Sequence, residues 1–272
     1  MKLSFSTLSC PDWSWTKVMD EAQRLGYEGI EGRGADGEMC LPKARPFLPE
    51  NVADTLAELT RRGLVLTDLG SSVAFHDPEK WEAALQEGKD YIDLAERLGV
   101  RYVRVFGDRV PNRDQAEQTT DLIAEGYRAL CAYIGERDVM ILQETHGDFP
   151  DLDLLRPVFE KVSDSRLGLL WDIEHVFKRY GADASVFFDW AAPHISHVHI
   201  KDTETQADGT FRLCGIGEGD VPIRADVKLL LAYGYDGFLS LEWEKKWQPH
   251  LAEPEVVVPH YIRYMRTLLA SL

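Results

Sequence analysis

The sequence predicts an α/β protein, a single (β/α)8 barrel, and three observations favour this fold. The chain has 272 residues, close to the roughly 250 residues of a typical barrel of this class. Short apolar runs alternate with amphipathic helical patterns along its length. Four successive late runs each end in one carboxylate or imidazole side chain. In such barrels the catalytic groups stand at the carboxyl ends of the strands.

Eight apolar runs bounded by turn signals are typical of buried parallel strands. Between them, apolar residues recur at three- and four-residue spacing, as in EKWEAALQEGKDYIDLAERLG. That spacing gives a helix one apolar stripe to pack against the strands. The predicted strands are Leu3–Ser6, Gly29–Gly32, Leu64–Leu69, Tyr102–Phe106, Val139–Glu144, Leu167–Asp172, Ile195–Ile200 and Phe238–Glu242.

Four predicted helices end in a glycine directly before a strand, at Gly26, Gly63, Gly99 and Gly234. A left-handed residue closes a helix, and glycine adopts that conformation without steric cost. No Pro/Ser-rich linker divides the chain, so we expect one domain over residues 1–272. The long connections follow the strand carboxyl ends, which places the functional face there. These predicted loops are 32–49, 107–113, 145–150, 173–181 and 201–222.

The composition argues against several classes of protein. Forty-six acidic and 30 basic residues give a net charge of −16, whereas a nucleic-acid binder needs a basic stripe. A small anionic substrate stays compatible, because a local pocket can be positive on an acidic protein. No apolar stretch is long enough for a transmembrane helix, and the start resembles a first strand, not a signal peptide. The four cysteines form no CxxC pair, which favours reduced thiols and a cytoplasmic protein.

The four polar residues at the strand ends are Glu144, Asp172, His199 and Glu242. Two Glu, one Asp and one His make a mostly oxygen site for one divalent cation. Each alone has an ordinary alternative: a solvated side chain, or for Asp172 a helix N-cap. Four such residues on successive strands favour a shared site. His197 shares a strand face with His199 but lies deeper, where we expect a core histidine or a partner of the ligands.

The motifs QETHGD, WDIEH, HVHIKDT, GIGEGDVP and LSLEWE occur in this order along the chain. Together they resemble the xylose-isomerase-like barrel superfamily, and within it most the sugar and sugar-phosphate 3-epimerases and isomerases. The early segment GYEGIEGRG also matches the second strand of such barrels. The resemblance covers nearly the whole chain and is more specific for the superfamily than for a substrate.

The resemblance implies a role for each site residue. The four predicted ligands would hold one divalent cation, with Mn²⁺, Mg²⁺, Co²⁺ and Zn²⁺ as candidates. Glu144 and Glu242 would also be the catalytic acid/base pair. His146 and His175 would contact the substrate, although from the residues alone either fits a solvated loop histidine.

Further substrate contacts are proposed from basic residues near strand ends. Arg104 in YVRVF and Arg33 in EGRG are candidate clamps for substrate or for a carboxylate, and structural pairing with barrel acids such as Glu31 or Asp68 is an equal alternative. Lys201 directly follows the strand of His199 and is a candidate substrate contact.

Two further features have more than one interpretation. The glycines of GIGEG, residues 215–219, could cradle a phosphate with backbone amides or form a flexible lid. Four tryptophans in the loops after the first and last strands could wall the sugar carbons or serve packing. They are Trp13, Trp15, Trp243 and Trp247.

These features predict an enzyme that epimerises or isomerises a ketose, a ketose phosphate or a related polyol. Proton removal next to a carbonyl creates an enediolate, which a divalent cation stabilises. Two carboxylates on opposite sides of the substrate can take and return the proton. An inosose-type dehydratase is the nearest alternative. An endonuclease-IV-like repair enzyme and a non-catalytic sugar-binding module are less favoured. A homo-oligomer fits the sequence as well as a monomer does.

Overall fold

A computed structural model describes all residues 1–272, and its centre is a closed barrel of eight parallel strands. Neighbouring strands follow the order β1-β10-β7-β6-β5-β4-β3-β2, so each pairs with its neighbours in sequence and β10 closes on β1. The (β/α)8 prediction is confirmed. The strands are β1 (Lys2–Ser6), β2 (Gly29–Gly32), β3 (Val65–Ala74), β4 (Tyr102–Phe106), β5 (Met140–Glu144), β6 (Leu167–Asp172), β7 (Ile195–Ile200) and β10 (Phe238–Leu241).

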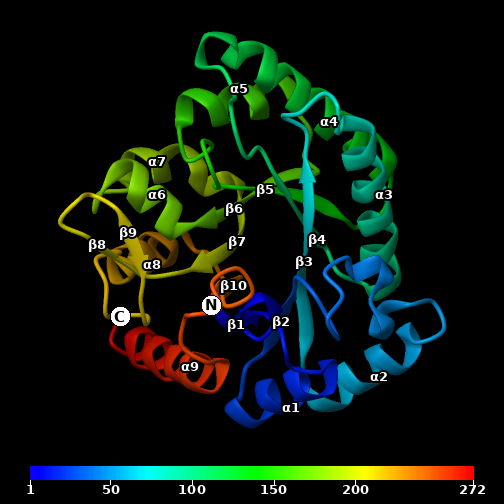
Figure 1. The fold of residues 1–272 in the computed structure, drawn as a ribbon, viewed down its shortest axis with the longest axis vertical. Helices are drawn as coiled ribbons and strands as arrows, with labels where there is room; N and C mark the ends of the chain where they lie inside the picture. The colour runs from blue at the N-terminus through cyan, green and yellow to red at the C-terminus, as the bar shows by residue number, and fades with distance from the viewer.

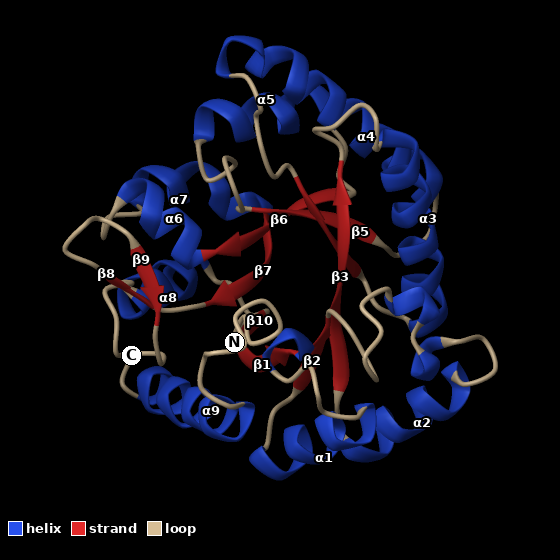
Figure 2. Cartoon of the chain, viewed as in Figure 1, coloured by secondary structure: helices blue, strands red, loops and turns tan.

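Helices surround the strands as an outer ring (Figure 1, Figure 2). The last helix lies next to the first, where Arg266 donates a hydrogen bond to the Leu25 carbonyl, so the two ends of the chain close the ring. The helices are α1 (Trp15–Leu25), α2 (Val52–Arg62), α3 (Trp81–Leu98), α4 (Ala116–Ile134), α5 (Leu152–Val162), α6 (Ile173–Tyr180), α7 (Ser185–Ala191), α8 (Ile223–Tyr233) and α9 (Pro254–Ala270).

The predicted helix ends at glycine are confirmed. Gly26, Gly63, Gly99 and Gly234 follow α1, α2, α3 and α8 with φ angles of 79°, 68°, 65° and 88°. Each glycine amide donates to a carbonyl of the last helical turn, which satisfies groups that the helix leaves open. The short returns let every helix pack back onto the barrel.

Strand boundaries agree with the sequence prediction to within one residue. The exception is the end of β3, which was expected at Leu69 and lies at Ala74. The register between β3 and β4 shifts between Gly70 and Ala74. Beside this irregularity, the Ser71 hydroxyl donates to the Arg104 carbonyl of β4 at 2.5 Å. The side-chain bond helps hold the strand edge where the backbone ladder is irregular.

Three of the predicted loops contain regular structure. Residues 173–181 were expected to be a loop, but they form α6, because the Asp172 carboxylate caps that helix. Residues 201–222 include an antiparallel hairpin, β8 (Thr203–Thr205) and β9 (Phe211–Leu213). Residues 32–49 include two 3₁₀ turns, Leu41–Lys43 and Arg45–Phe47.

The barrel strands are buried on both faces, as their near-continuous apolar sequences require. Trp171 of β6, for example, is fully buried and packs against Phe187 and Phe188 of α7. All four cysteines are free thiols. None of the helices combines the length and apolar character needed to cross a membrane. Against this apolar background, buried charged groups at the carboxyl ends of the strands are the exception.

A glycine inside α4 tests how tightly the helical layer packs. An added Cβ at Gly126 would lie 2.3 Å from Cγ of the buried Phe75 ring. Glycine-to-alanine changes inside helices normally stabilise by about 1 kcal/mol, but overpacking costs about 1–3 kcal/mol. We therefore expect Gly126→Ala to lower the free energy of unfolding, measured by urea denaturation. Glu125→Ala, at the exposed neighbouring position, is the control, and a stabilised Gly126→Ala protein would contradict the packing argument.

Candidate active site at the carboxyl end of the barrel

The fold brings the four predicted ligands together. Glu144 and Asp172 are the last residues of β5 and β6, His199 lies in β7, and Glu242 directly follows β10. The strand register sets Asp172 beside His199, and His199 beside Ser240 of β10. One ligand atom from each of the four residues lies within 4.8 Å of the others. All four side chains are buried, although the sequence separates the outer two by almost a hundred positions.

The imidazole of His199 is at the centre of this cluster. Its Nδ1 lies 3.4 Å from Glu144 Oε1, 3.4 Å from Glu242 Oε2 and 3.8 Å from Asp172 Oδ2. Nδ1 is buried and makes no hydrogen bond. A buried ring nitrogen without a partner, facing three carboxylates, is a donor set that suits a divalent cation. The residues present therefore fit the cation that the sequence analysis expects.

The other side of the His199 ring is held by Glu31, a residue expected from the sequence only as a partner for arginine. Glu31 Oε2 lies 3.0 Å from Nε2 of His199 and 3.0 Å from Nε2 of His197. Burial raises the pKa of Glu31, but the two histidines outweigh it, so that pKa lies below its usual range. The contact fixes the ring so that Nδ1 faces the cluster. His197 is also buried and shares Glu31 with His199, in line with its expected role as a partner of the ligands.

Asp172 serves two roles through its two oxygens. Oδ1 accepts hydrogen bonds from the amides of Glu174, at 2.9 Å, and His175, at 3.2 Å, and so caps α6. Oδ2 faces the cluster. The helix cap, which was one interpretation of this residue, is therefore compatible with a ligand role for the second oxygen. Burial raises the pKa of Asp172 to about 6.

Two buried cations offset the negative charge of the carboxylates. Arg104 Nη1 donates to Glu144 Oε2 at 3.0 Å. Lys201, only 2% exposed, has its Nζ 2.9 Å from Asp172 Oδ2 and 2.5 Å from Glu242 Oε2. Burial opposes the charge of Lys201, but the surrounding carboxylates raise its pKa well above the usual range. Lys201 is thus held as an ammonium group inside the barrel mouth.

Glu144 and Glu242 are both ionised, because the cations beside them lower their pKa values. Burial raises the pKa of Glu242, but Lys201 and His199 outweigh it and hold that pKa well below its usual range. Burial and Glu242 also raise the pKa of Glu144, and Arg104 with His199 reverses the effect, leaving it lowered. Glu244, two residues beyond Glu242, contacts Lys201 Nζ at 3.0 Å and lies outside the four-residue cluster.

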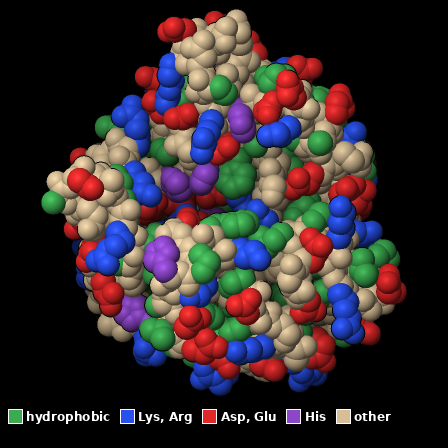
Figure 3. Space-filling model, in the orientation of Figure 1, with side chains coloured by type: hydrophobic (Ala, Val, Ile, Leu, Met, Phe, Trp, Pro, Cys, Tyr) green, Lys and Arg blue, Asp and Glu red, His purple; other side chains and the backbone are tan.

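A cavity of about 140 Å³ opens onto the cluster. Figure 3 shows the corresponding face, with histidine side chains around a hollow whose floor carries acidic atoms. The small volume suits a compact polar molecule better than a drug-sized ligand. The cavity is lined by Leu8, Arg33, Arg104, Phe106, Glu144, His146, Lys201, Glu242, Glu244 and Trp247.

The predicted substrate contacts lie in or beside this cavity. His146, Arg104 and Lys201 line it. His175 does not, but its ring centre lies 4.6 Å from that of His146, and it lines an adjoining polar cavity of about 190 Å³. His146 is oriented by Asp108, whose Oδ1 lies 3.3 Å from its Nδ1. Whether these four residues bind substrate stays a prediction.

Two proposed features are corrected by the structure. The amides of Gly217 and Gly219 donate to Asp202 Oδ2 at 2.7 and 3.0 Å, so these two glycines do not offer their amides to a phosphate. The expected pairing of an arginine with a barrel acid occurs at Arg104, but its partner is neither Glu31 nor Asp68. Glu31 contacts histidines, the Asp68 carboxylate oxygens make no hydrogen bond, and Arg104 pairs with Glu144.

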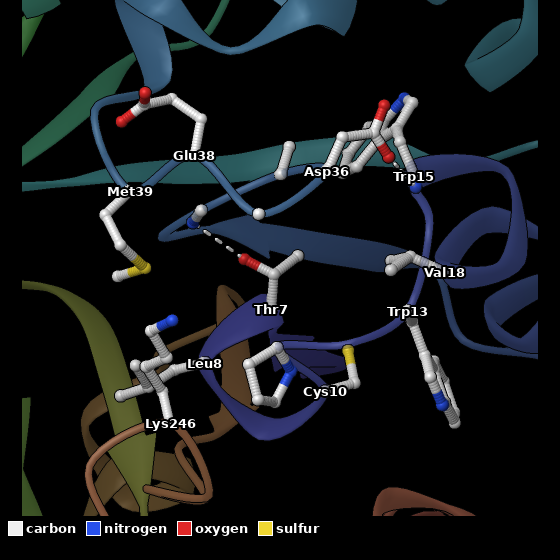
Figure 4. A pocket seen from close by; sticks show the side chains of 14 residues that line it. Thr7, Leu8, Cys10, Trp13, Trp15, Val18, Asp36, Glu38, Met39 and Lys246 are labelled. Carbon is white, nitrogen blue, oxygen red and sulfur yellow. Dashed lines mark hydrogen bonds between the residues drawn. The ribbon is translucent and has the colours of Figure 1, made fainter.

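Of the four loop tryptophans, only Trp247 lines the active-site cavity. Trp243 is buried and donates from Nε1 to the Ala252 carbonyl. Trp13 and Trp15 line a separate pocket between the loops after β1 and β2 (Figure 4). That pocket has a volume of about 20 Å³, room for about one water molecule. It is lined by acidic side chains such as Asp36 but has no histidine or arginine, and we assign it a packing role.

The curated relatives are two inosose dehydratases. One, from Klebsiella pneumoniae subsp. pneumoniae, is 28% identical over 249 residues, which cover 80% of this chain and 82% of the relative. The other, from Klebsiella pneumoniae strain 342, is 27% identical over 179 residues, covering 60% of this chain and 58% of its own length. The second match thus spans less than two thirds of that relative.

Solved structures share the barrel over almost its full length. The probable 3-DHS dehydratase AsbF from Bacillus anthracis superposes with a TM-score of 0.81 at 20% identity, covering 98% of this chain and 99% of that one. IolI with a bound zinc atom gives 0.79 at 19% identity, covering 100% and 99%. A D-tagatose 3-epimerase-like protein gives 0.77 at 17% identity, covering 100% and 99%. At these identities the likeness concerns the fold.

The family model described as "Xylose isomerase-like TIM barrel" matches residues 19–268, nearly the whole chain. The match includes the strands that carry all four residues of the buried cluster. It confirms the resemblance stated from the sequence motifs. This chain belongs to the xylose isomerase-like TIM barrel family.

Proposed function

We propose that this protein is a divalent-metal-dependent enzyme that removes a proton next to the carbonyl of a small polyhydroxy ketone. The observation that carries the proposal is the buried cluster of Glu144, Asp172, His199 and Glu242 facing a compact cavity. Burial of three carboxylates is costly unless a cation compensates them. We further propose dehydration as the net reaction, because both curated relatives are inosose dehydratases.

The same four residues would hold the cation. A bound divalent ion would supply Lewis-acid stabilisation for the negative charge of an enediolate. Carboxylate oxygens and one imidazole suit Mn²⁺, Mg²⁺, Co²⁺ or Zn²⁺, and zinc is the ion in the IolI structure. Glu31 would keep His199 oriented with Nδ1 toward the ion.

Glu144 and Glu242 are the groups placed to move protons. They come from β5 and β10, which are separated in the barrel by β6 and β7. Both are ionised, so either carboxylate can accept a proton from carbon. Arg104 fixes Glu144 through Oε2, which orients Oε1 toward the cluster. Lys201 Nζ lines the same cavity and carries a proton that a departing hydroxyl group requires.

Epimerisation of a ketose is the second candidate. It is favoured by the arrangement of Glu144 and Glu242, which reach one cavity from non-adjacent strands. Two such carboxylates can take a proton from one face of a carbon and return it to the other. Dehydration and epimerisation share the first proton removal and differ in the fate of the enediolate.

Product analysis separates these two reactions. We expect metal-loaded protein to convert a cyclic polyhydroxy ketone into a product lighter by one water, detected by mass spectrometry, with a neutral inosose and a carboxylated ring ketone tested side by side. A ketohexose tested in parallel should return unchanged in mass and configuration. If the ketohexose is inverted at one carbon, as read by NMR, and both ring ketones are untouched, epimerisation is the activity.

Conservative changes at the acid/base pair should impair chemistry more than binding. Glu144→Gln and Glu242→Gln keep shape and one oxygen ligand but lose the base, so we expect a loss of about 100-fold or more in proton transfer. The measurement is exchange of substrate C–H with deuterated water, after metal content has been confirmed. Glu160→Gln, at an exposed position, is the control. Unchanged exchange in both site variants would assign the chemistry to other residues.

Removal of the cation should destabilise the fold. A ligand at 100 times its Kd stabilises the native state by about 2.7 kcal/mol, which for a chain of this size corresponds to about 5–10 °C in Tm. We expect the Tm to fall in EDTA and to recover with Mn²⁺, Mg²⁺, Co²⁺ or Zn²⁺.

A matched pair of variants assigns this effect to the cluster. Asp172→Ala removes both side-chain oxygens from the cluster, so the EDTA-dependent shift should disappear, whatever the loss of the α6 cap does to the Tm itself. Asp138→Ala changes a side chain that is 82% exposed and should keep the shift. Full metal occupancy in Asp172→Ala, or a wild-type Tm indifferent to EDTA, would show that the cluster is no metal site.

A further inference from the structure

Arg33 is a buried cation in the active-site cavity. It directly follows β2 and is only 7% exposed. It lines the cavity together with Glu144 and Glu242, the two groups placed to move protons. Its guanidinium carbon lies 5.8 Å from the centre of the Trp247 ring, which covers the same cavity. A charge in this position faces any molecule that reaches the acid/base pair.

The hydrogen-bond partners of Arg33 are neutral. Its Nη2 donates to the Ser72 hydroxyl at 3.0 Å, and its Nη1 lies 3.5 Å from the Met39 carbonyl. No Asp or Glu forms an ion pair with it. Burial and the neighbouring Arg104 lower its pKa, and Glu242 and Glu87, which form no ion pair with it, only partly offset them. Such a charge is costly to bury, and the cost falls when an anion binds beside it.

The other two cations of the cavity differ in this respect. Arg104 is paired with Glu144, and Lys201 with Asp172, Glu242 and Glu244. Carboxylates of the protein therefore neutralise both of these charges. Among the three, Arg33 alone forms no ion pair with a carboxylate of the protein. A guanidinium binds carboxylate and phosphate oxygens through parallel hydrogen bonds, which gives direction as well as attraction.

We infer that the substrate carries an anionic group, a carboxylate or a phosphate, and that Arg33 binds it. The inference rests on the proposed function, because it assigns the substrate class of the same site. Anchoring one end of the molecule on the β2 side would orient its carbon skeleton over Glu144 and Glu242. The net charge of −16 does not oppose this, since a local positive group determines the field inside a small cavity.

Calorimetric titration of the Mn²⁺-loaded protein with three ring polyols tests the inference. Quinate carries a carboxylate, myo-inositol 1-phosphate carries a phosphate, and myo-inositol is neutral. We expect at least one anionic probe to bind about 10- to 100-fold more tightly than myo-inositol, the range that hydrogen bonds between charged groups provide. The probe that benefits identifies carboxylate or phosphate as the recognised group.

Variants assign the preference to Arg33. We expect Arg33→Gln to bind the anionic probe and myo-inositol with affinities within about 3-fold of each other. Arg33→Lys keeps the positive charge but loses the two parallel donors of the guanidinium, and it should retain part of the preference. Arg97→Gln makes the same change of charge at an exposed position with no ion pair and should leave it intact. An anion that binds only through Mn²⁺ would be preferred equally by wild type and Arg33→Gln, and that result overturns the inference.

Two other outcomes also overturn it: equal affinity of wild type for all three probes, and no binding of either anionic probe at millimolar concentration. Mn²⁺ content and Tm, measured for every variant, show that Arg33→Gln is folded and loaded. They also separate this inference from the proposed function. Loss of the metal site would appear as absent Mn²⁺ in wild type, whereas failure of the inference leaves Mn²⁺ binding and deuterium exchange unchanged.

Discussion

Three carboxylates buried within 4.8 Å of one another form the constraint on which the rest of the site depends. Like charges at this separation repel strongly in a low-dielectric interior, so the barrel mouth must supply compensation. Arg104 neutralises Glu144, Lys201 lies between Asp172 and Glu242, and the His199 ring faces all three. This network explains why so many charged groups are buried at one end of an otherwise apolar barrel.

The buried cations around this cluster differ in their partners. Lys201 and Arg104 are engaged by carboxylates of the protein, and His199 is held from behind by Glu31. Arg33, held only by neutral groups, is left for an external anion. A buried charge with no partner in the protein is thus a more informative feature than a paired one, because its cost has to be met by something that binds.

A single site of this kind is compatible with more than one net reaction. Proton removal beside a carbonyl requires a stabilised enediolate and a positioned base, which dehydration and epimerisation share. The fate of the enediolate then depends on the groups around the cavity rather than on the cluster. In this chain those groups include Lys201, His146 and Trp247, which come from three different loops or strand ends.

The sequence by itself determined the barrel, its strand positions and the helix-closing glycines, because hydrophobic period and glycine conformation are local properties. It also indicated the four cluster residues, because a polar residue at the end of an apolar run can be recognised from the sequence alone. The tertiary structure decided the partners. Glu31 reaches His197 and His199 across more than 160 positions, the Gly217 and Gly219 amides are taken by Asp202, and Arg33 is left without an anion. Such pairings depend on distances between strands, and no local pattern encodes them.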